Sequence, residues 1–120
     1  MTATPLEFPD LAVRVLDPGF PWSPFHPGVE IHRLAGTGES GPSSALLRYA
    51  PGASVPRHRH PGYEHILVLH GAQVDDRGRH GAGSLTINPP GSEHAIHCPE
   101  GSIVLALWEH PVVFAGEPTR

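Results

Sequence analysis

Short apolar runs separated by glycine and proline dominate the hydrophobic pattern of the chain. Several of these runs alternate apolar and polar residues, and a period of two is typical of a strand with one buried face. No segment keeps a 3.6-residue apolar period over several turns. The pattern predicts short strands at 11–16, 29–34, 45–50, 64–71, 84–88, 94–98, 102–110 and 112–115.

The residues between these runs are typical of turns. "PG" follows the run at 45–50, "PPG" follows the run at 84–88, and "GTGESGPSS" at 36–44 reads as a flexible loop. Short strands at this spacing predict an all-β sandwich or barrel. We expect one domain over 1–120, with its core at 45–108 and a proline-broken arm or edge strand at 1–28.

Composition and charge exclude several classes of protein. The 120 residues include 8 basic and 12 acidic ones, no lysine, and a net charge of -4, which favours neither a nucleic-acid partner nor a membrane surface. The first residues lack the basic start and apolar core of a signal peptide, and no run is long enough to span a bilayer. The single cysteine, Cys98, cannot form an internal disulfide. We therefore expect a cytoplasmic protein.

Histidine is concentrated in one part of the chain, where seven of the 10 histidines lie between positions 58 and 97. In "PRHRHPGYEHILVLHG", residues 56–71, strand alternation places His58 and His60 on one face, and Glu64 begins an apolar strand. Two imidazoles and a carboxylate in one small space suit Zn, Fe, Ni or Mn and leave coordination positions open. His94, which follows the turn "PPGSE", is the candidate for a further ligand. The alternatives are a solvated loop with a capping carboxylate and a histidine that merely follows a turn.

Other residues near these histidines are open to more than one interpretation. Glu64 would be a metal ligand or, if released, a general base. Tyr63 would line the mouth of the site or donate to a ligand, so it is a second candidate catalytic residue. His65 and His97 fall on the opposite face and are expected at the surface. Cys98 shares the face of His94 and reads as a small buried hydrophobe, with a pocket-lining or redox-sensitive role as the alternative.

The spacing of these residues resembles the two motifs of the cupin superfamily. The fixed positions of the first motif are matched by Gly52, His58, His60, Glu64 and Gly71. Those of the second motif are matched by Gly83, Pro89, Gly91 and His94, with Cys98 in place of the usual final asparagine. Only eleven residues, 72–82, separate the motifs.

The amino-acid sequence is most similar to that of the ChrR-like cupins, the group named for the metal-binding domain of a zinc anti-sigma factor. The similar segments are "PGASVPRHRHPGYEHILVLHG", "GSLTINPPGSEHA" and "PWSPFHPGV". The resemblance implies a double-stranded β-helix, the cupin or jelly-roll barrel. It also implies one divalent metal ion held by His58, His60, Glu64 and His94. The outward residues Leu67 and Leu69 need a cover, either the N-terminal strand or a second subunit, and because cupins commonly dimerise we expect a homodimer.

Two functions follow from this resemblance. The first, which we favour, is a metal-dependent enzyme that acts on a small organic molecule, as a dioxygenase-like oxidoreductase or as a Lewis-acid isomerase or decarboxylase. The second is a non-catalytic ChrR-like sensor or regulatory module, although the prolines in residues 1–28 do not suit a helical sigma-binding segment. A structural cupin without metal is disfavoured because all four ligand residues are present. The metal stays open because such a ligand set accepts several first-row ions.

Overall fold

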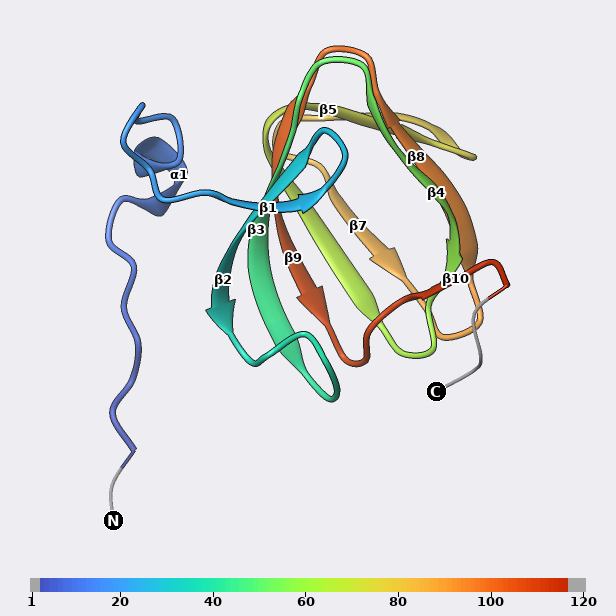
Figure 1. Ribbon diagram of the computed structural model, residues 1–120, viewed down its shortest axis with the longest axis horizontal. Coiled ribbons are helices and arrows are strands. Elements are labelled where there is room, and N and C mark those ends of the chain that lie inside the picture. The colour runs from blue at the N-terminus through green and yellow to red at the C-terminus, as the bar shows by residue number, and fades with distance from the viewer. Residues whose placement is uncertain (1–2, 117–120) are drawn as a thin grey trace.

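The computed structural model describes residues 3–116, and nearly all of its regular secondary structure is β-strand (Figure 1). One short helix precedes the strands. The elements in chain order are α1 (Leu11–Arg14), β1 (Ser23–His26), β2 (Val29–Ala35), β3 (Ser43–Tyr49), β4 (Ala53–Arg59), β5 (Glu64–Asp75), β6 (Gly78–Gly81), β7 (Leu85–Asn88), β8 (Glu93–Cys98), β9 (Ser102–Trp108) and β10 (Val113–Phe114).

All the strand pairs are antiparallel, and the sheet curls into a barrel. The strand order is β1-β2-β3-β9-β5-β8-β4-β10, with β6 and β7 also paired to β5. In Figure 1 strands β2, β3 and β9 form one wall and strands β4 and β8 the opposite wall. The all-β barrel predicted from the sequence is therefore confirmed.

Strand β5 joins the two walls because it bends at Gly71. Residues before Gly71 pair with β7 and β9, whereas residues after it pair with β6 and β8. Gly71 has a φ of 72°, and a Cβ built there would lie 2.2 Å from the carbonyl oxygen of Gly101. Only glycine fits this close backbone contact, which explains why β5 continues to Asp75 instead of ending at Gly71 as expected.

The core lies between the two walls and is formed by inward positions of alternating strands. Its buried members come from β2, β3, β5, β8 and β9, and Val55 adds a side chain from β4. Inward alternation is clear in β8, where His94, Ile96 and Cys98 are buried and His97 is exposed. This is the pattern that the sequence predicted for residues 94–98.

The expected strand at 11–16 is wrong, because Leu11–Arg14 forms the helix α1. Leu11 and Val15 are four positions apart, so one helix face presents both to the sheet, where they pack in a cluster with Phe20. Val13, which a strand would have placed on their side, is 67% exposed. A six-residue window is too short to separate the two periods.

The N-terminal segment covers part of the outer face of the sheet. Its residues Val15 and Phe20 pack with Leu46 and Ile103, and Leu69 and Leu105 border this cluster. The cover expected over Leu69 is therefore supplied by the chain's own N-terminal segment. The homodimer stays a prediction.

Three strands, β1, β4 and β6, were not among the strands predicted from the sequence. Strand β1 is an edge strand that pairs only with β2, a position that tolerates the missing N–H of Pro24. Strand β6 lies in a segment of glycine and charged residues that reads as a turn. Within residues 3–116, no helix is both long and apolar enough to cross a lipid bilayer.

Candidate metal centre

Three imidazoles meet inside the barrel on two neighbouring strands. His58 in β4 lies opposite His94 in β8, and His60 follows the last residue of β4. All three side chains are buried, and their ligand atoms lie within 4.8 Å of one another. The structure thus brings together the three histidines selected by the spacing, at a separation that one metal ion can bridge.

A β-bulge directs the two β4 histidines inward. The pairing of β4 with β8 shifts between Val55 and His58, and Pro56 and Arg57 are both exposed within this irregularity. Without the extra residue, alternation from the buried Val55 would bring Arg57 inward and turn His58 to solvent. Pro56 is tolerated here because a residue within a bulge does not have to donate a hydrogen bond to the neighbouring strand.

Each imidazole is anchored through its Nδ1 atom. The His58 ring donates to the carbonyl oxygen of Pro56 at 2.9 Å, because a carbonyl can only accept. The His60 ring meets the Ser92 hydroxyl at 2.9 Å, and that hydroxyl donates to the Pro89 carbonyl at 2.6 Å. Ser92 therefore accepts from His60.

The third anchor is a carboxylate. Nδ1 of His94 lies 3.1 Å from Oδ2 of Asp75, and the His94 ring donates this hydrogen bond to the carboxylate. With Nδ1 protonated on all three rings, each neutral imidazole presents the lone pair of Nε2. Burial lowers the pKa of His58, which favours the neutral form that binds metal.

The Nε2 atoms fit a metal ion. Those of His60 and His94 are buried, and neither has a hydrogen-bond partner among the residues that the structure describes. Nε2 of His60 lies 3.1 Å from Oε1 of Glu64, so two lone-pair atoms face each other unless a cation or a proton lies between them. A buried set of such atoms is the chemistry that a divalent ion satisfies.

Glu64 lies beside the histidines as the first residue of β5. Its Oε1 atom is 3.1 Å from Nε2 of His60 and 3.9 Å from Nε2 of His94. Neighbouring ligands about 2.1 Å from one ion lie roughly 3.0–3.4 Å apart, so the His60 distance fits a shared ion, whereas the His94 distance is longer than that range. In the metal-free protein, burial acts to raise the pKa of the Glu64 carboxyl, but a proton held between this carboxylate and Nε2 of His60, together with the Trp108 hydrogen bond, outweighs that effect, and the pKa lies below its usual value.

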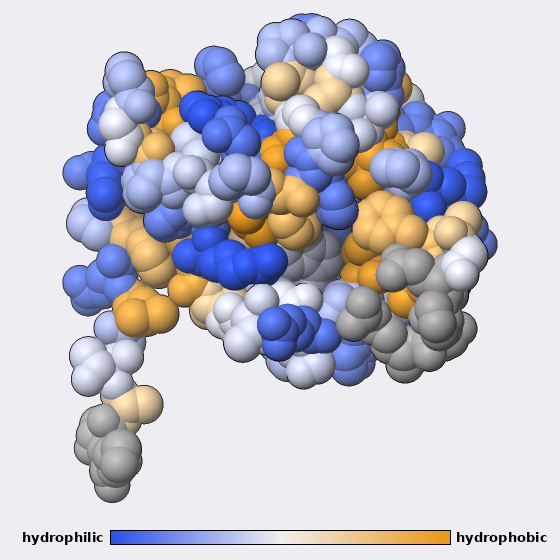
Figure 2. All heavy atoms as spheres, viewed as in Figure 1, coloured by the Kyte–Doolittle hydropathy of each residue, from blue (hydrophilic) through white to orange (hydrophobic). Residues whose placement is uncertain are grey.

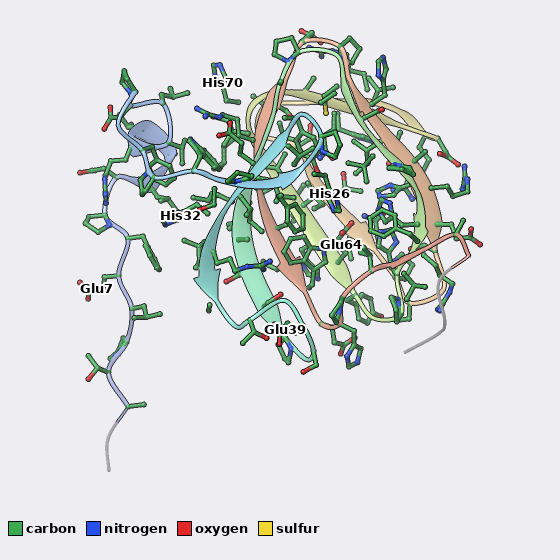
Figure 3. The ribbon with its side chains drawn as sticks, in the orientation of Figure 1. Glu7, His26, His32, Glu39, Glu64 and His70 are labelled. Atoms are coloured by element: carbon green, nitrogen blue, oxygen red, sulfur yellow. The ribbon has the colours of Figure 1, made fainter. Side chains whose placement is uncertain are left out.

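A cavity of about 210 Å³ opens beside this cluster. It reaches His58 and Glu64 and is otherwise mostly apolar, with walls that include Phe25, Val55, Ile66, Ile96, Trp108 and Phe114. Figure 3 shows Glu64 inside the barrel, below His26 of the β1–β2 hairpin. In the space-filling view, hydrophobic and hydrophilic side chains meet around the middle of the visible face (Figure 2). A small molecule in this cavity would lie against the metal-binding side chains.

Tyr63 is not brought to the cluster. Its side chain is 49% exposed, its ring centroid is 6.4 Å from that of His65, and it borders a separate shallow groove. This placement gives no support to the expected catalytic role of Tyr63. His97 is exposed and His65 half-buried, and His70 points away from the barrel (Figure 3).

Cys98 is buried, as expected for a small hydrophobe. Its sulfur lies 3.4 Å from the Ser102 hydroxyl, and burial raises the pKa of the thiol. It is a free cysteine.

The residues that anchor the cluster were missed by sequence reasoning. Asp75 and Ser92 hold two histidines, and Asn88 and Trp108 hold Glu64. Asn88 carries a detectable signal, because it is a polar residue at the inward end of "SLTIN". The contacts of Asp75, Ser92 and Trp108 could not be predicted, because they depend on how β5 pairs with its neighbours and on the conformation of the loops.

Comparison with known proteins decides the family. The ChrR Cupin-like domain family matches residues 12–113, which is most of the chain. The chain belongs to this family. As a ChrR-like cupin it is similar to the anti-sigma-E factor ChrR of Cereibacter sphaeroides, with 39% identity over 77 residues. That match covers 62% of this chain but only 36% of the length of the relative.

Solved structures share the cupin fold. The complex of SigE with the anti-sigma ChrR from Rhodobacter sphaeroides matches 88% of this cupin and 70% of that chain, with a TM-score of 0.66 and 26% identity. An acetylacetone dioxygenase from Acinetobacter johnsonii matches 95% of this cupin and 78% of that chain, with a TM-score of 0.73 and 17% identity. At that identity the likeness to the dioxygenase shows the fold alone. The predicted cupin barrel is confirmed.

Proposed function

We propose that this cupin binds one divalent transition metal ion through His58, His60, His94 and Glu64. The observation that supports this most is the common arrangement of the three rings, each anchored at Nδ1 by a separate group. This arrangement aims three lone pairs at one buried space, next to a carboxylate. Ligand groups that are fixed in advance lose little entropy when the ion binds.

We further propose that the centre acts on a small organic molecule bound in the adjacent cavity. When bound, a divalent ion supplies Lewis-acid polarisation or, with a redox-active metal, oxidative chemistry. The chain itself supplies apolar walls that exclude water and orient the molecule, and a Glu64 carboxylate held on both oxygens. The reactions that fit are a dioxygenase-like oxidation and a Lewis-acid isomerisation or decarboxylation.

Oxygen uptake tests the enzymatic proposal. Protein purified without an affinity tag would be loaded anaerobically with Fe(II) and mixed with β-diketones or thiols. We expect uptake with the wild-type chain, none with His60→Ala, and unchanged uptake with His97→Ala, whose side chain is exposed on the other face of β8. A fully loaded protein that consumes no oxygen and leaves every substrate unaltered would contradict an oxidative role.

A regulatory function is the second candidate, and the curated relative favours it. The relative is named an anti-sigma-E factor, and a related chain forms a complex with SigE. In this alternative the metal centre and its cavity would sense a molecule without converting it. Isothermal titration that shows saturable binding, with no product by NMR after prolonged incubation, would favour sensing over catalysis.

A further inference from the structure

A cationic side chain lies on the inner face of the barrel, at the mouth of the cavity. In β2, Val29 and Ile31 are buried in the core, and alternation places Arg33 on the same face two residues later. Arg33 lines the same cavity as Glu64. Among the described residues that line it, Arg33 is the one guanidinium and Glu64 the one carboxylate. The cavity therefore has one cationic side chain, Arg33, and one anionic side chain, Glu64, in walls that are otherwise mostly apolar.

The exposed Arg33 side chain lies beside Phe25 and the loop that contains Gly38. Its guanidinium carbon lies 5.7 Å from the centroid of the Phe25 ring. On the loop between β2 and β3, Gly38 has a φ of 78°, and a Cβ there would lie 2.2 Å from Nη1 of Arg33. The loop therefore lies close to the guanidinium, and the positive φ of Gly38 is the feature that favours glycine there.

We propose that the cavity takes a small organic anion. Its carboxylate would meet the planar fork of Arg33, its apolar body would lie between Phe25, Ile96 and Phe114, and its far end would face His58 and Glu64. A volume of about 210 Å³ equals roughly seven water molecules, which suits an acid of few carbon atoms. This ligand class rests on the proposed metal centre, because the far end of the molecule meets its residues.

Binding of matched acids and amides tests this ligand class. The zinc-loaded full chain would be titrated calorimetrically with butanoate, hexanoate and benzoate, and with the corresponding neutral amides. We expect at least one acid to bind tenfold or more tightly than its amide. Arg33→Gln should remove that preference, and Arg14→Gln, a change on the exposed face of α1, should preserve it.

Each other outcome overturns the ligand class. It fails if no acid binds, if amides bind equally well, or if Arg33→Gln leaves the preference intact. Metal content measured on the same samples separates the two proposals. A zinc-loaded protein that ignores acids contradicts only the ligand class, whereas a protein that takes up no metal contradicts the proposed function.

A different set of contacts carries a second inference, about the turn between β5 and β6. Oδ2 of Asp75 lies 3.1 Å from Nδ1 of His94. Two residues later, Arg77 donates from Nη2 to Oδ1 of Asn88 at 3.0 Å, and Asn88 donates from Nδ2 to Oε1 of Glu64 at 2.9 Å. The end of β5 thus contacts His94 directly through the buried Asp75 carboxylate, and the exposed Arg77 two residues later reaches Glu64 through Asn88.

The donors and acceptors in these contacts have one consistent direction. Arginine can only donate, so the Asn88 oxygen faces Arg77 and the Asn88 amide nitrogen must face Glu64. A carboxylate can only accept, so Asp75 fixes the proton of His94 on Nδ1. Removing either turn residue would release the orientation of one side chain in the cluster.

Further hydrogen bonds and an ion pair hold the turn against the rest of the barrel. The backbone N–H of Arg77 donates to Oδ1 of Asp75 at 2.9 Å, and Nε2 of His80 lies 2.9 Å from the same oxygen. Asp76 forms an ion pair with Arg57 and accepts from the backbone N–H of Ala95. These contacts join the turn to β4 and β8, the strands that carry the histidines.

We infer that Asp75 and Arg77 are positioning residues that set the affinity and geometry of the metal centre. Asp75→Asn should weaken zinc binding about 10- to 100-fold, the range for groups that orient metal ligands. Arg77→Met should weaken it several-fold, and both should shift the visible absorption bands of the Co(II)-loaded protein. Asp75→Glu and Arg77→Lys should recover part of the affinity.

Arg79→Met is the matched control, because Arg79 lies on the same hairpin but pairs with Glu100. We expect its affinity and Co(II) spectrum to equal those of the wild type. Unchanged affinity and spectra in Asp75→Asn and Arg77→Met would overturn the inference. So would an equal loss in Arg79→Met, which would point to general stability of the hairpin.

Discussion

The indole of Trp108 donates a hydrogen bond to Oε2 of Glu64 at 2.7 Å, although the two residues are 44 positions apart in the chain. They lie directly opposite each other in the pairing of β5 with β9. Asn88 lies opposite Glu64 on the other side, in β7, and donates to Oε1. Each carboxylate oxygen thus has a donor from one flanking strand, so the sheet fixes the plane of the carboxylate.

Trp108→Phe tests this arrangement. The change keeps an aromatic ring but leaves Oε2 of the buried carboxylate without its donor. We expect the free energy of unfolding of the metal-free protein to fall by about 1.5–3 kcal/mol in urea titrations, the range for hydrogen bonds to charged groups. Zinc affinity should fall as well.

Trp22→Phe is the control for that change, since Nε1 of Trp22 is buried and has no hydrogen-bond partner among residues 3–116. It should lower the free energy of unfolding by less than Trp108→Phe and leave zinc affinity unchanged. Equal losses from both variants would mean that aromatic packing, and not the bond to Glu64, is being measured.

Gly71→Ala should be among the most damaging small substitutions in the barrel. The added Cβ would lie 2.2 Å from the carbonyl oxygen of Gly101, on a backbone with a φ of 72°. Strain and overpacking together predict a loss of about 2–6 kcal/mol in the free energy of unfolding. Gly83→Ala is the control, because its φ is 90° but its Cβ would meet nothing within 4 Å. If both cost the same in urea denaturation, the close contact with Gly101 is not what requires glycine.

The contribution of the N-terminal segment is tested by Phe20→Ala. Phe20 is 9% exposed and packs with Trp22 and His32 at ring-centroid distances of 5.0 and 4.8 Å. We expect a loss of about 3 kcal/mol in the free energy of unfolding. Zinc affinity should not change, because this cluster lies on the outer face of the sheet. Phe8→Ala, at a 39% exposed position, should cost less than about 0.5 kcal/mol. An unaltered melting temperature in Phe20→Ala would show that the segment does not stabilise the barrel.

Cys98 should be unreactive in the folded protein. Burial raises the pKa of its thiol, so less thiolate is present at pH 8 than in the unfolded chain, and reagents reach it only after local opening. Absorbance after addition of a disulfide reagent should rise slowly in buffer and rapidly in urea. Fast stoichiometric reaction of the folded chain would instead support a redox-sensitive role.

The sequence was sufficient for the barrel and for the gathering of His58, His60 and His94. Fixed spacings between glycines, prolines and histidines are local properties, and alternation gives the face of each side chain once a strand is assumed. The helix at 11–14 was missed because a spacing of four and a spacing of two both fit so short a segment.

The anchors of the metal centre depend on long-range pairing. Trp108 reaches Glu64 through the register of β5 with β9, and Asp75 reaches His94 because β5 bends at Gly71. Neither register nor bend can be read from hydrophobic pattern alone. Tyr63 directly precedes Glu64, and alternation places it on the opposite, solvent-facing side, so its expected role at the site stays a prediction.

The most direct test of the account is the metal content of protein purified without an affinity tag, followed by zinc titration of the metal-free chain. We expect about one ion per chain for the wild type, with release of protons as ligands bind. The His58→Ala/His60→Ala variant should bind no ion yet keep the circular dichroism spectrum of a folded β-protein. His97→Ala should behave as the wild type. A wild-type chain that carries no metal and binds none on titration would contradict the metal centre and every function proposed for it.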